Sequence, residues 1–313
     1  MKYLLRSITD YAAPWIDAGR LHRGTVHSVY KGAVNLTAGR RLFALQPADS
    51  PVSPLTLRCD FPLSALDAAP GAPFTIGRGT IRTKNAVLTL TDTPDVIPTR
   101  LAPEADTDPA AYRKSGDAAY KVLAEVYLSR ARGTLGRCIS QLYGFQPLFG
   151  GTGHASTLFL SAAKDILSRA EGAFSDADYP RFAAALKGLI GLGSGLTPSG
   201  DDFICGVFAA FRGAGAWYHP AMPDLLHQLT HIENRTHPLS AAFITCAAEG
   251  YFSQAILNFF NRDQSVFNYL TTVKEFRKIG HSSGIDSLCG MAFALNCLCQ
   301  ASCKPEINGL NLK

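Results

Sequence analysis

Roughly the first hundred residues alternate short β-branched and apolar runs with clusters of turn-forming residues. The runs lie at residues 24–30, 33–36, 41–45 and 86–91. Gly, Pro, Asp and Ser separate them, and ten of the 18 prolines fall between residues 47 and 109, which leaves little room for long helices. This pattern predicts a small antiparallel sheet or an open barrel.

After residue 109 the apolar positions follow a helical period instead, recurring every three or four residues. Gly, Pro or Asp stands at the ends of these segments, as is typical of helix termini. The expected helices cover residues 110–132, 157–170, 179–190, 220–232, 240–249, 266–276 and 283–299. We therefore predict an α+β fold with three parts: a β-rich N-terminal lobe (1–105), a mainly α-helical lobe (106–303) and a flexible tail (304–313).

Composition and charge exclude several classes of protein. Of the 313 residues 47% are hydrophobic, enough for a sizeable core. The net charge of +5 comes from scattered basic residues, so we expect no nucleic-acid partner. The longest apolar stretch, nine residues at 203–211, is far shorter than the roughly 20 of a membrane span. The N-terminus lacks a secretion signal, and the eight cysteines lack CxxC spacing, so we expect a cytoplasmic protein with reduced thiols.

Two segments of the helical part resemble each other without a gap, residues 197–206 and residues 281–290. The identical pairs are Ser199/Ser283, Gly200/Gly284, Asp202/Asp286, Cys205/Cys289 and Gly206/Gly290. Each copy reads Ser-x-x-Asp before an apolar run, which predicts a capping box with the serine as N-cap and the aspartate three residues later. The pattern alone also fits two ordinary, well-started helices.

The glycines of the two copies suggest how these helices meet. Gly206 and Gly290 lie on the same helical face as the serine and aspartate of their copies, seven residues after the serine. A missing side chain there permits close packing just below the two helix starts. We therefore expect the two helices to pack together, with their N-termini converging on one pocket. The first copy is also preceded by three glycines in residues 191–195, a loop able to point backbone N–H groups at an anion.

Other polar residues near the two copies are candidates for the same site. His281 opens the second copy and is either a proton shuttle or a structural histidine. Arg235 is either the fixed cation for a carboxylate or phosphate, or part of a surface salt bridge. We interpret Glu249, at the end of a helical run, as structural.

These residues carry a resemblance to a known family. Residues 191–202 and 280–286 look like the two hallmark loops of the AllH-like family, that of the AllH subunit of oxamate carbamoyltransferase. Arg235, Thr236 and Ser240 and residues 249–252 also resemble the family pattern, and Gly24, Val26 and residues 33–36 resemble its opening strands more loosely. Ser194 stands where many relatives have proline.

The resemblance implies a role in the use of purine-derived nitrogen, as in allantoin degradation. The reaction would be reversible carbamoyl transfer, oxalurate and phosphate giving oxamate and carbamoyl phosphate. It also implies a complex with two partner subunits, one resembling an acyl-CoA synthetase and one from another uncharacterised family. Neither the acceptor nor the subunit that bears the active centre follows from the resemblance.

Carbamoyl transfer needs donors for phosphate oxygens, a dipole for the developing oxyanion and a proton shuttle. We assign His281, Ser199 and Ser283 to catalysis. Substrate or phosphate binding is assigned to a larger set: Gly193, Gly195, Thr197, Arg235, Ser282 and Gly284. Asp201, Asp202 and Asp286 would repel phosphate unless they act as structural caps or hold a metal ion.

That tension leaves two alternatives open. Asp201, Asp202, Asp286 and His281 can instead form a Mg²⁺ or Mn²⁺ site of a hydrolase, similar in logic to the Asp-rich helix starts of ADP-ribosylglycohydrolases. Loss of a metal-dependent activity in Asp202→Asn would identify it. The other alternative is a non-catalytic, ligand-sensing subunit, which predicts undiminished activity of the complex when His281 and Arg235 are replaced by alanine.

Overall fold

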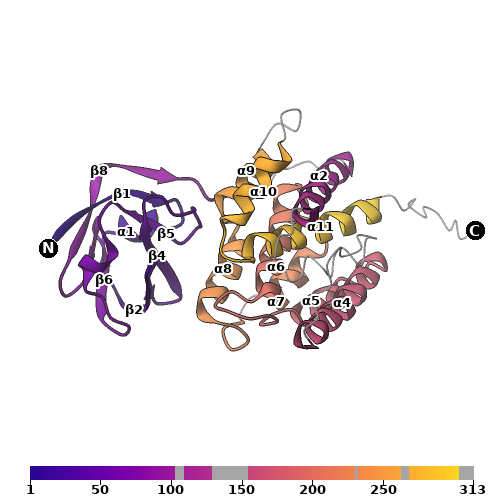
Figure 1. Ribbon diagram of the computed structural model, residues 1–313, viewed down its shortest axis with the longest axis horizontal. Coiled ribbons are helices and arrows are strands. Elements are labelled where there is room, and N and C mark those ends of the chain that lie inside the picture. The colour runs from indigo at the N-terminus through magenta and orange to yellow at the C-terminus, as the bar shows by residue number, and fades with distance from the viewer. Residues whose placement is uncertain (103–108, 129–153, 230–231, 262–267, 303–313) are drawn as a thin grey trace, which may run out of the picture. The chain divides into compact units, whose positions relative to one another are not determined.

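The computed structural model describes residues 1–102, 109–128, 154–229, 232–261 and 268–302 (Figure 1). Its α+β class confirms the prediction, with strands in the first hundred residues and helices thereafter. The predicted tail at 304–313 lies outside the described residues. In the part of the chain that is described, no helix is both long enough and apolar enough to cross a membrane.

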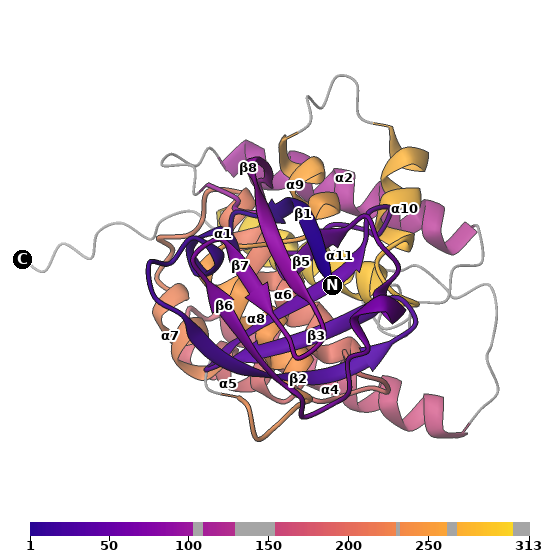
Figure 2. The ribbon, with the colours of Figure 1, turned by 90° about the vertical axis from the view of Figure 1, so that its left-hand side faces the viewer.

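The eight strands of the N-terminal region form a closed barrel in the order β1-β5-β4-β3-β2-β6-β7-β8 (Figure 2). Their bounds are β1 Lys2–Thr9, β2 His22–Tyr30, β3 Ala33–Ala38, β4 Arg41–Pro47, β5 Thr56–Cys59, β6 Pro73–Gly77, β7 Thr80–Arg82 and β8 Val87–Ile97. A short helix α1 (Ala13–Ile16) and a 3-10 turn (Leu63–Leu66) connect strands. Two features refine the predicted sheet: β1 pairs with β8 and so closes the barrel, and the pairs β1/β8 and β4/β5 are parallel.

Apolar side chains fill the barrel. Leu5, Leu36, Phe43 and Ile76 are fully buried. The exposed neighbours of Leu5, Leu4 and Arg6, point outward, whereas β4 is buried without interruption from Leu42 to Leu45. Gly24 in β2 is required by packing, because a methyl group there would lie 2.3 Å from the Thr37 carbonyl oxygen and 2.5 Å from the Phe74 ring.

The helices of the second region agree with most of the predicted ones. They are α2 (Pro109–Leu128), α4 (His154–Ser175), α5 (Tyr179–Lys187), α6 (Ser199–Gly213), α7 (Met222–Leu229), α8 (Pro238–Glu249), α9 (Gln254–Asn261), α10 (Tyr269–Arg277) and α11 (Ser283–Ser302). α9 was not predicted, and the predicted segments 110–132, 220–232 and 266–276 each reach into residues that the structure does not describe. α6 is apolar all round its middle and correspondingly buried on every side.

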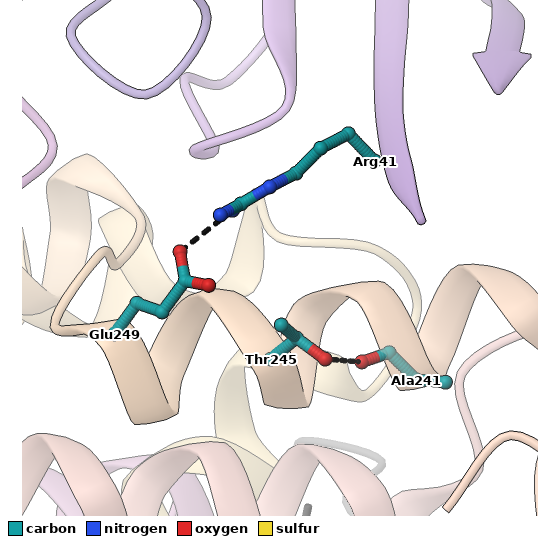
Figure 3. A network of polar contacts seen from close by, with 4 residues as sticks. All are labelled: Arg41, Ala241, Thr245 and Glu249. Atoms are coloured by element: carbon teal, nitrogen blue, oxygen red, sulfur yellow. Dashed lines mark hydrogen bonds and ion pairs between the residues drawn. The ribbon is translucent and has the colours of Figure 1, made fainter. Parts of the chain in front are cut away.

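The chain divides into two compact units. Unit 1 comprises Met1–Leu101 with Glu249–Asn258, and unit 2 comprises Ala102–Ala248 with Phe259–Lys313. The segment Glu249–Asn258 joins the barrel through backbone bonds, among them Phe252 N–H to the Thr99 carbonyl at 2.8 Å. The Glu249 carboxylate forms an ion pair with the Arg41 guanidinium, which donates to it at 2.6 Å (Figure 3). Burial of Arg41 opposes its charge, but its hydrogen bonds to Glu249 and Tyr11 outweigh this and raise its pKa.

Candidate functional site

Two helix–loop–helix repeats underlie the sequence echo, α5 with α6 and α10 with α11. The first helix of each repeat has nine residues and starts at a tyrosine, Tyr179 or Tyr269. Each is capped by a side chain, because Asp178 accepts a bond from Arg181 N–H (3.1 Å) and Asn268 from Thr271 N–H (3.0 Å). The repeats differ in their connectors, residues 188–198 in the first and only 278–282 in the second. The first repeat thus contains six additional residues.

α6 and α11 cross in direct backbone contact, which confirms the predicted close packing. A methyl group on Gly206 would lie 1.9 Å from the Ser287 carbonyl oxygen, and one on Gly290 would lie 1.9 Å from that of Phe203. This reciprocal contact places the same position of each repeat against the other helix. Only glycine fits at either position without a shift of backbone.

The starts of the two helices are built alike. A methyl group on Gly200 would lie 1.9 Å from the Leu189 carbonyl oxygen, and one on Gly284 the same distance from that of Phe276. The start of α6 therefore rests on the turn that follows α5, and the start of α11 on the last turn of α10. The Gly284 N–H donates to the Ile279 carbonyl at 3.1 Å, so this amide is engaged in its own turn rather than turned toward a ligand.

The predicted capping role of Ser199 is wrong by one position. Ser199 is the first helical residue of α6, and extended Pro198 is the N-cap, with no side-chain capping bond. The Pro198 carbonyl accepts from the N–H groups of Asp201 (2.9 Å) and Asp202 (3.2 Å). α11 begins likewise at Ser283, with the Asp286 N–H donating to the Ser282 carbonyl at 2.9 Å. Proline takes the cap position readily because its fixed φ suits extended backbone before a helix.

Asp201 is a fully buried acceptor that joins three segments. Its Oδ1 accepts from the Gly191 N–H at 2.7 Å, and its Oδ2 accepts from the Ser240 hydroxyl at 2.6 Å and from the Thr236 hydroxyl. Sequence reasoning offered Asp201 as a cap or a metal ligand and did not predict these partners. The carboxylate instead fixes the loop before α6 against the start of α8.

Asp202 lies where the starts of α6 and α11 meet. The hydroxyls of Thr197 and Ser283 are 3.0 Å apart and both hydrogen-bond to Asp202. Burial raises the pKa of Asp202 well above its ordinary value, the charges of Asp286 and Asp201 add to the rise, and the two hydroxyls oppose it. The predicted convergence of the two helix starts is therefore confirmed at this point.

The glycine loop, defined as residues 191–197, has a backbone that only glycine adopts readily. Gly191, Gly193 and Gly195 have φ values of +79°, +130° and +93°. The Gly191 N–H is taken by Asp201, but no described residue accepts a hydrogen bond from the N–H groups of residues 193–197. Residues 193–195 are exposed and residues 196 and 197 are half-buried, so the loop presents amides without a described acceptor next to the start of α6.

The remaining predicted site residues differ in burial and in their contacts with the glycine loop. The Arg235 carbonyl packs on the glycine loop, because a methyl group on Gly191 would lie 2.5 Å from that oxygen. The side chains of Arg235 and His281 are exposed, and among the described residues neither bonds to the Thr197–Ser283 pair. Ser199 is buried and Ser282 half-buried. Within the described ranges, no three His, Cys, Asp or Glu side chains are grouped to hold a metal ion.

Comparison with known families adds an independent observation. Residues 189–295 match the family described as oxamate carbamoyltransferase subunit AllH, and residues 6–95 match the AllH family N-terminal domain. The two matches together cover more than half of the chain. The first spans the glycine loop and the starts of both α6 and α11. No solved structure matches the chain.

Proposed function

This chain belongs to the AllH family of oxamate carbamoyltransferase subunits, and from this premise we propose that it takes part in carbamoyl transfer between oxamate and phosphate. As a subunit it works with partners. In the proposed reaction a phosphate oxygen attacks the carbamoyl carbon of oxalurate, the carbon–nitrogen bond breaks, and oxamate and carbamoyl phosphate result. The reverse direction uses the same groups.

One observation carries the location of the site. The amides of residues 193–197 lack a described partner and adjoin the start of a helix, where the dipole favours negative charge. Both the phosphate and the oxyanion formed at the carbamoyl carbon are anions that such donors stabilise. The connector that carries these donors is six residues longer than its counterpart, which supports a role for it beyond packing.

The side chains around the loop receive roles that follow from their exposure. The Thr197 and Ser283 hydroxyls stand at the junction of the helix starts, next to the loop amides, and would orient the substrate. Exposed Arg235 would hold the oxamate carboxylate, and exposed His281 would exchange a proton with solvent. Buried Ser199 and Gly284 support the backbone of the site, and half-buried Ser282 adds a hydroxyl at the start of α11.

The cation-dependent hydrolase has less support. Asp201, one of its expected ligands, already accepts three hydrogen bonds, one from the glycine loop and two from the hydroxyls of Thr236 and Ser240. The described acidic residues also do not form a group of three that would hold a metal ion. We therefore place the carboxylates in positioning and proton transfer.

The test is carbamoyl phosphate formation from oxalurate and phosphate by the chain purified with its co-expressed partner subunits. Gly193→Ala should lower turnover at least about tenfold, because its methyl group would lie 2.6 Å from the Ser199 nitrogen and its φ of +130° disfavours alanine. The matched control is Gly172→Ala, where a methyl group meets nothing within 4 Å.

Co-purification of the partners and their identification by mass spectrometry verify that each variant still assembles. Partners resembling an acyl-CoA synthetase and a second uncharacterised family are expected. Wild-type turnover in a Gly193→Ala complex would contradict the loop as the anion site and would favour the ligand-sensing alternative. No turnover by the wild-type complex would contradict the proposed reaction.

A further inference from the structure

We infer that the Asp202 carboxyl is the buried proton relay of this site and acts on the substrate through the hydroxyls of Ser283 and Thr197. This inference deepens the proposed function and rests on it. It assigns a role to a carboxylate that would otherwise repel an anionic substrate.

The position of Asp202 favours a neutral carboxyl. Its side chain is only 7% exposed, and Oδ2 is buried with no hydrogen-bond partner among the described residues. An ionised carboxylate with an unsatisfied oxygen is far more costly in such a place than a protonated one. Two hydroxyls bonded to the same side chain link it to the surface of the site.

The surrounding charges act in the same direction as burial. Asp201 on α6 and Asp286 on α11 are the charges that reach Asp202, and both are negative when ionised. The Cys205 thiol on α6 is also near, but burial first and then the charges of Asp202 and Asp201 raise its pKa, which keeps it neutral. Burial and the two carboxylates disfavour the charged form of Asp202 and outweigh the Ser283 and Thr197 hydroxyls, which favour it.

The proton balance of the reaction requires such a group. Hydrogen phosphate attacks the carbamoyl carbon of oxalurate, and the departing nitrogen must gain one proton to leave as the oxamate amide. Asp202 supplies this proton through the Ser283 or Thr197 hydroxyl, and the phosphate hydroxyl returns one to Asp202. No other reactant is consumed, and the carboxyl ends neutral, as it began.

The first experiment measures the pH dependence of turnover in the assembled complex. Turnover should fall as pH rises through the pKa of Asp202, because only the protonated form donates. Asp202→Asn should lower turnover about 100-fold or more and remove this alkaline limb. Asp286→Asn should keep the limb but move it to lower pH, because it removes a neighbouring negative charge. Asp176→Asn, at an exposed position, should retain the wild-type profile.

The second experiment needs no activity and uses the purified chain. A raised folded pKa gives Asp202 a stabilising contribution that is complete below about pH 4 and is lost as pH rises through the folded pKa. The thermal unfolding midpoint of Asp202→Asn should therefore exceed that of wild type by a margin that grows with pH. The same comparison for Asp176→Asn should show no such growth.

The two experiments distinguish failure of the relay from failure of the proposed function. Parallel pH dependence of unfolding in wild type and Asp202→Asn would show an ordinary, ionised carboxylate and overturn the inference. Turnover with an unaltered alkaline limb in Asp202→Asn would overturn the relay and leave the proposed function intact. Absence of turnover in the wild-type complex would overturn the proposed function and the relay together, while unfolding still reports the protonation of Asp202.

Discussion

The two helix–loop–helix repeats of unit 2 have the same parts and differ at one place. Both have a nine-residue capped first helix, a glycine that rests on a backbone carbonyl at or just after the end of that helix, and a second glycine at the α6–α11 crossing. Only the first carries the long connector with the glycine loop. Where a duplicated framework departs from its own symmetry, the departure serves something other than packing.

One substitution accompanies the longer connector. Asp201 in the first repeat corresponds to Ile285 in the second, and both are buried. Ile285 is a buried apolar side chain, whereas Asp201 accepts the bonds that hold the glycine loop and the start of α8. The longer connector and the carboxylate that anchors it thus occur together, and only in the first repeat.

The largest predicted effect comes from substitutions at the α6–α11 crossing, the feature to which both repeats contribute a glycine. Gly206→Ala should destabilise the chain by about 3 kcal/mol or more, because its methyl group would lie 1.9 Å from backbone rather than from a movable side chain. Gly290→Ala should have an equal effect, since the crossing is reciprocal. Urea unfolding of the two variants measures both.

The control for this pair is Gly172→Ala in α4. A methyl group there meets nothing within 4 Å, and alanine suits a helix better than glycine, so about 0.5 kcal/mol should be gained. Stability within error of wild type in Gly206→Ala would contradict the close crossing.

The next largest effect should distinguish the first repeat from the second. Asp201→Ala should cost about 2–3 kcal/mol, because the Gly191 amide and the Ser240 and Thr236 hydroxyls lose their shared acceptor. It should also weaken phosphate binding by the released glycine loop. At the matching position, Ile285→Val should cost about 1 kcal/mol and leave phosphate binding unchanged.

Unfolding and phosphate-binding calorimetry on these two variants form one comparison. Equal loss of phosphate binding in both would show that binding follows stability alone. Loss confined to Asp201→Ala would tie the anion site to the loop of the first repeat.

The extent to which sequence predicted the fold depended on the range of the interactions. β-branched runs predicted β2, β3, β4 and much of β8, because alternation within a strand is local. Closure of the barrel rests on β1 contacting β5 and β8, and the parallel pairs are β1/β8 and β4/β5; no local pattern encodes these pairings. α9 was missed because eight residues give too short a period to distinguish from a loop.

The features of the candidate site also divide into those that the sequence predicted and those that it did not. The repeated glycines predicted the helix crossing, since a missing side chain at a fixed offset has a direct geometric consequence. The anchor role of Asp201 was not predictable, because Thr236 and Ser240 lie 35 and 39 residues further along the chain. The capping error arose from one residue, Pro198, whose backbone takes the position that the Ser-x-x-Asp pattern assigns to serine.

A smaller effect tests the junction of the two helix starts. Thr197→Val should cost about 1 kcal/mol, because it removes a hydroxyl that bonds to Ser283 and Asp202. That hydroxyl lowers the pKa of Asp202, so its loss should raise the pKa further and move the alkaline limb of turnover to higher pH. A limb moved to lower pH would contradict the arrangement.

The smallest effects test whether the first helices of the two repeats are equivalent. Asp178→Ala and Asn268→Ala each remove an exposed cap of one backbone N–H and should cost about 0.5 kcal/mol. The Asp178 variant should lose slightly more at low salt, because a charged cap also meets the positive end of the helix dipole, and the excess should vanish at high salt. The two caps share no partner, so the double variant should show the sum of the single losses. A double variant that departs clearly from that sum in urea unfolding would indicate that the repeats are coupled beyond the α6–α11 crossing.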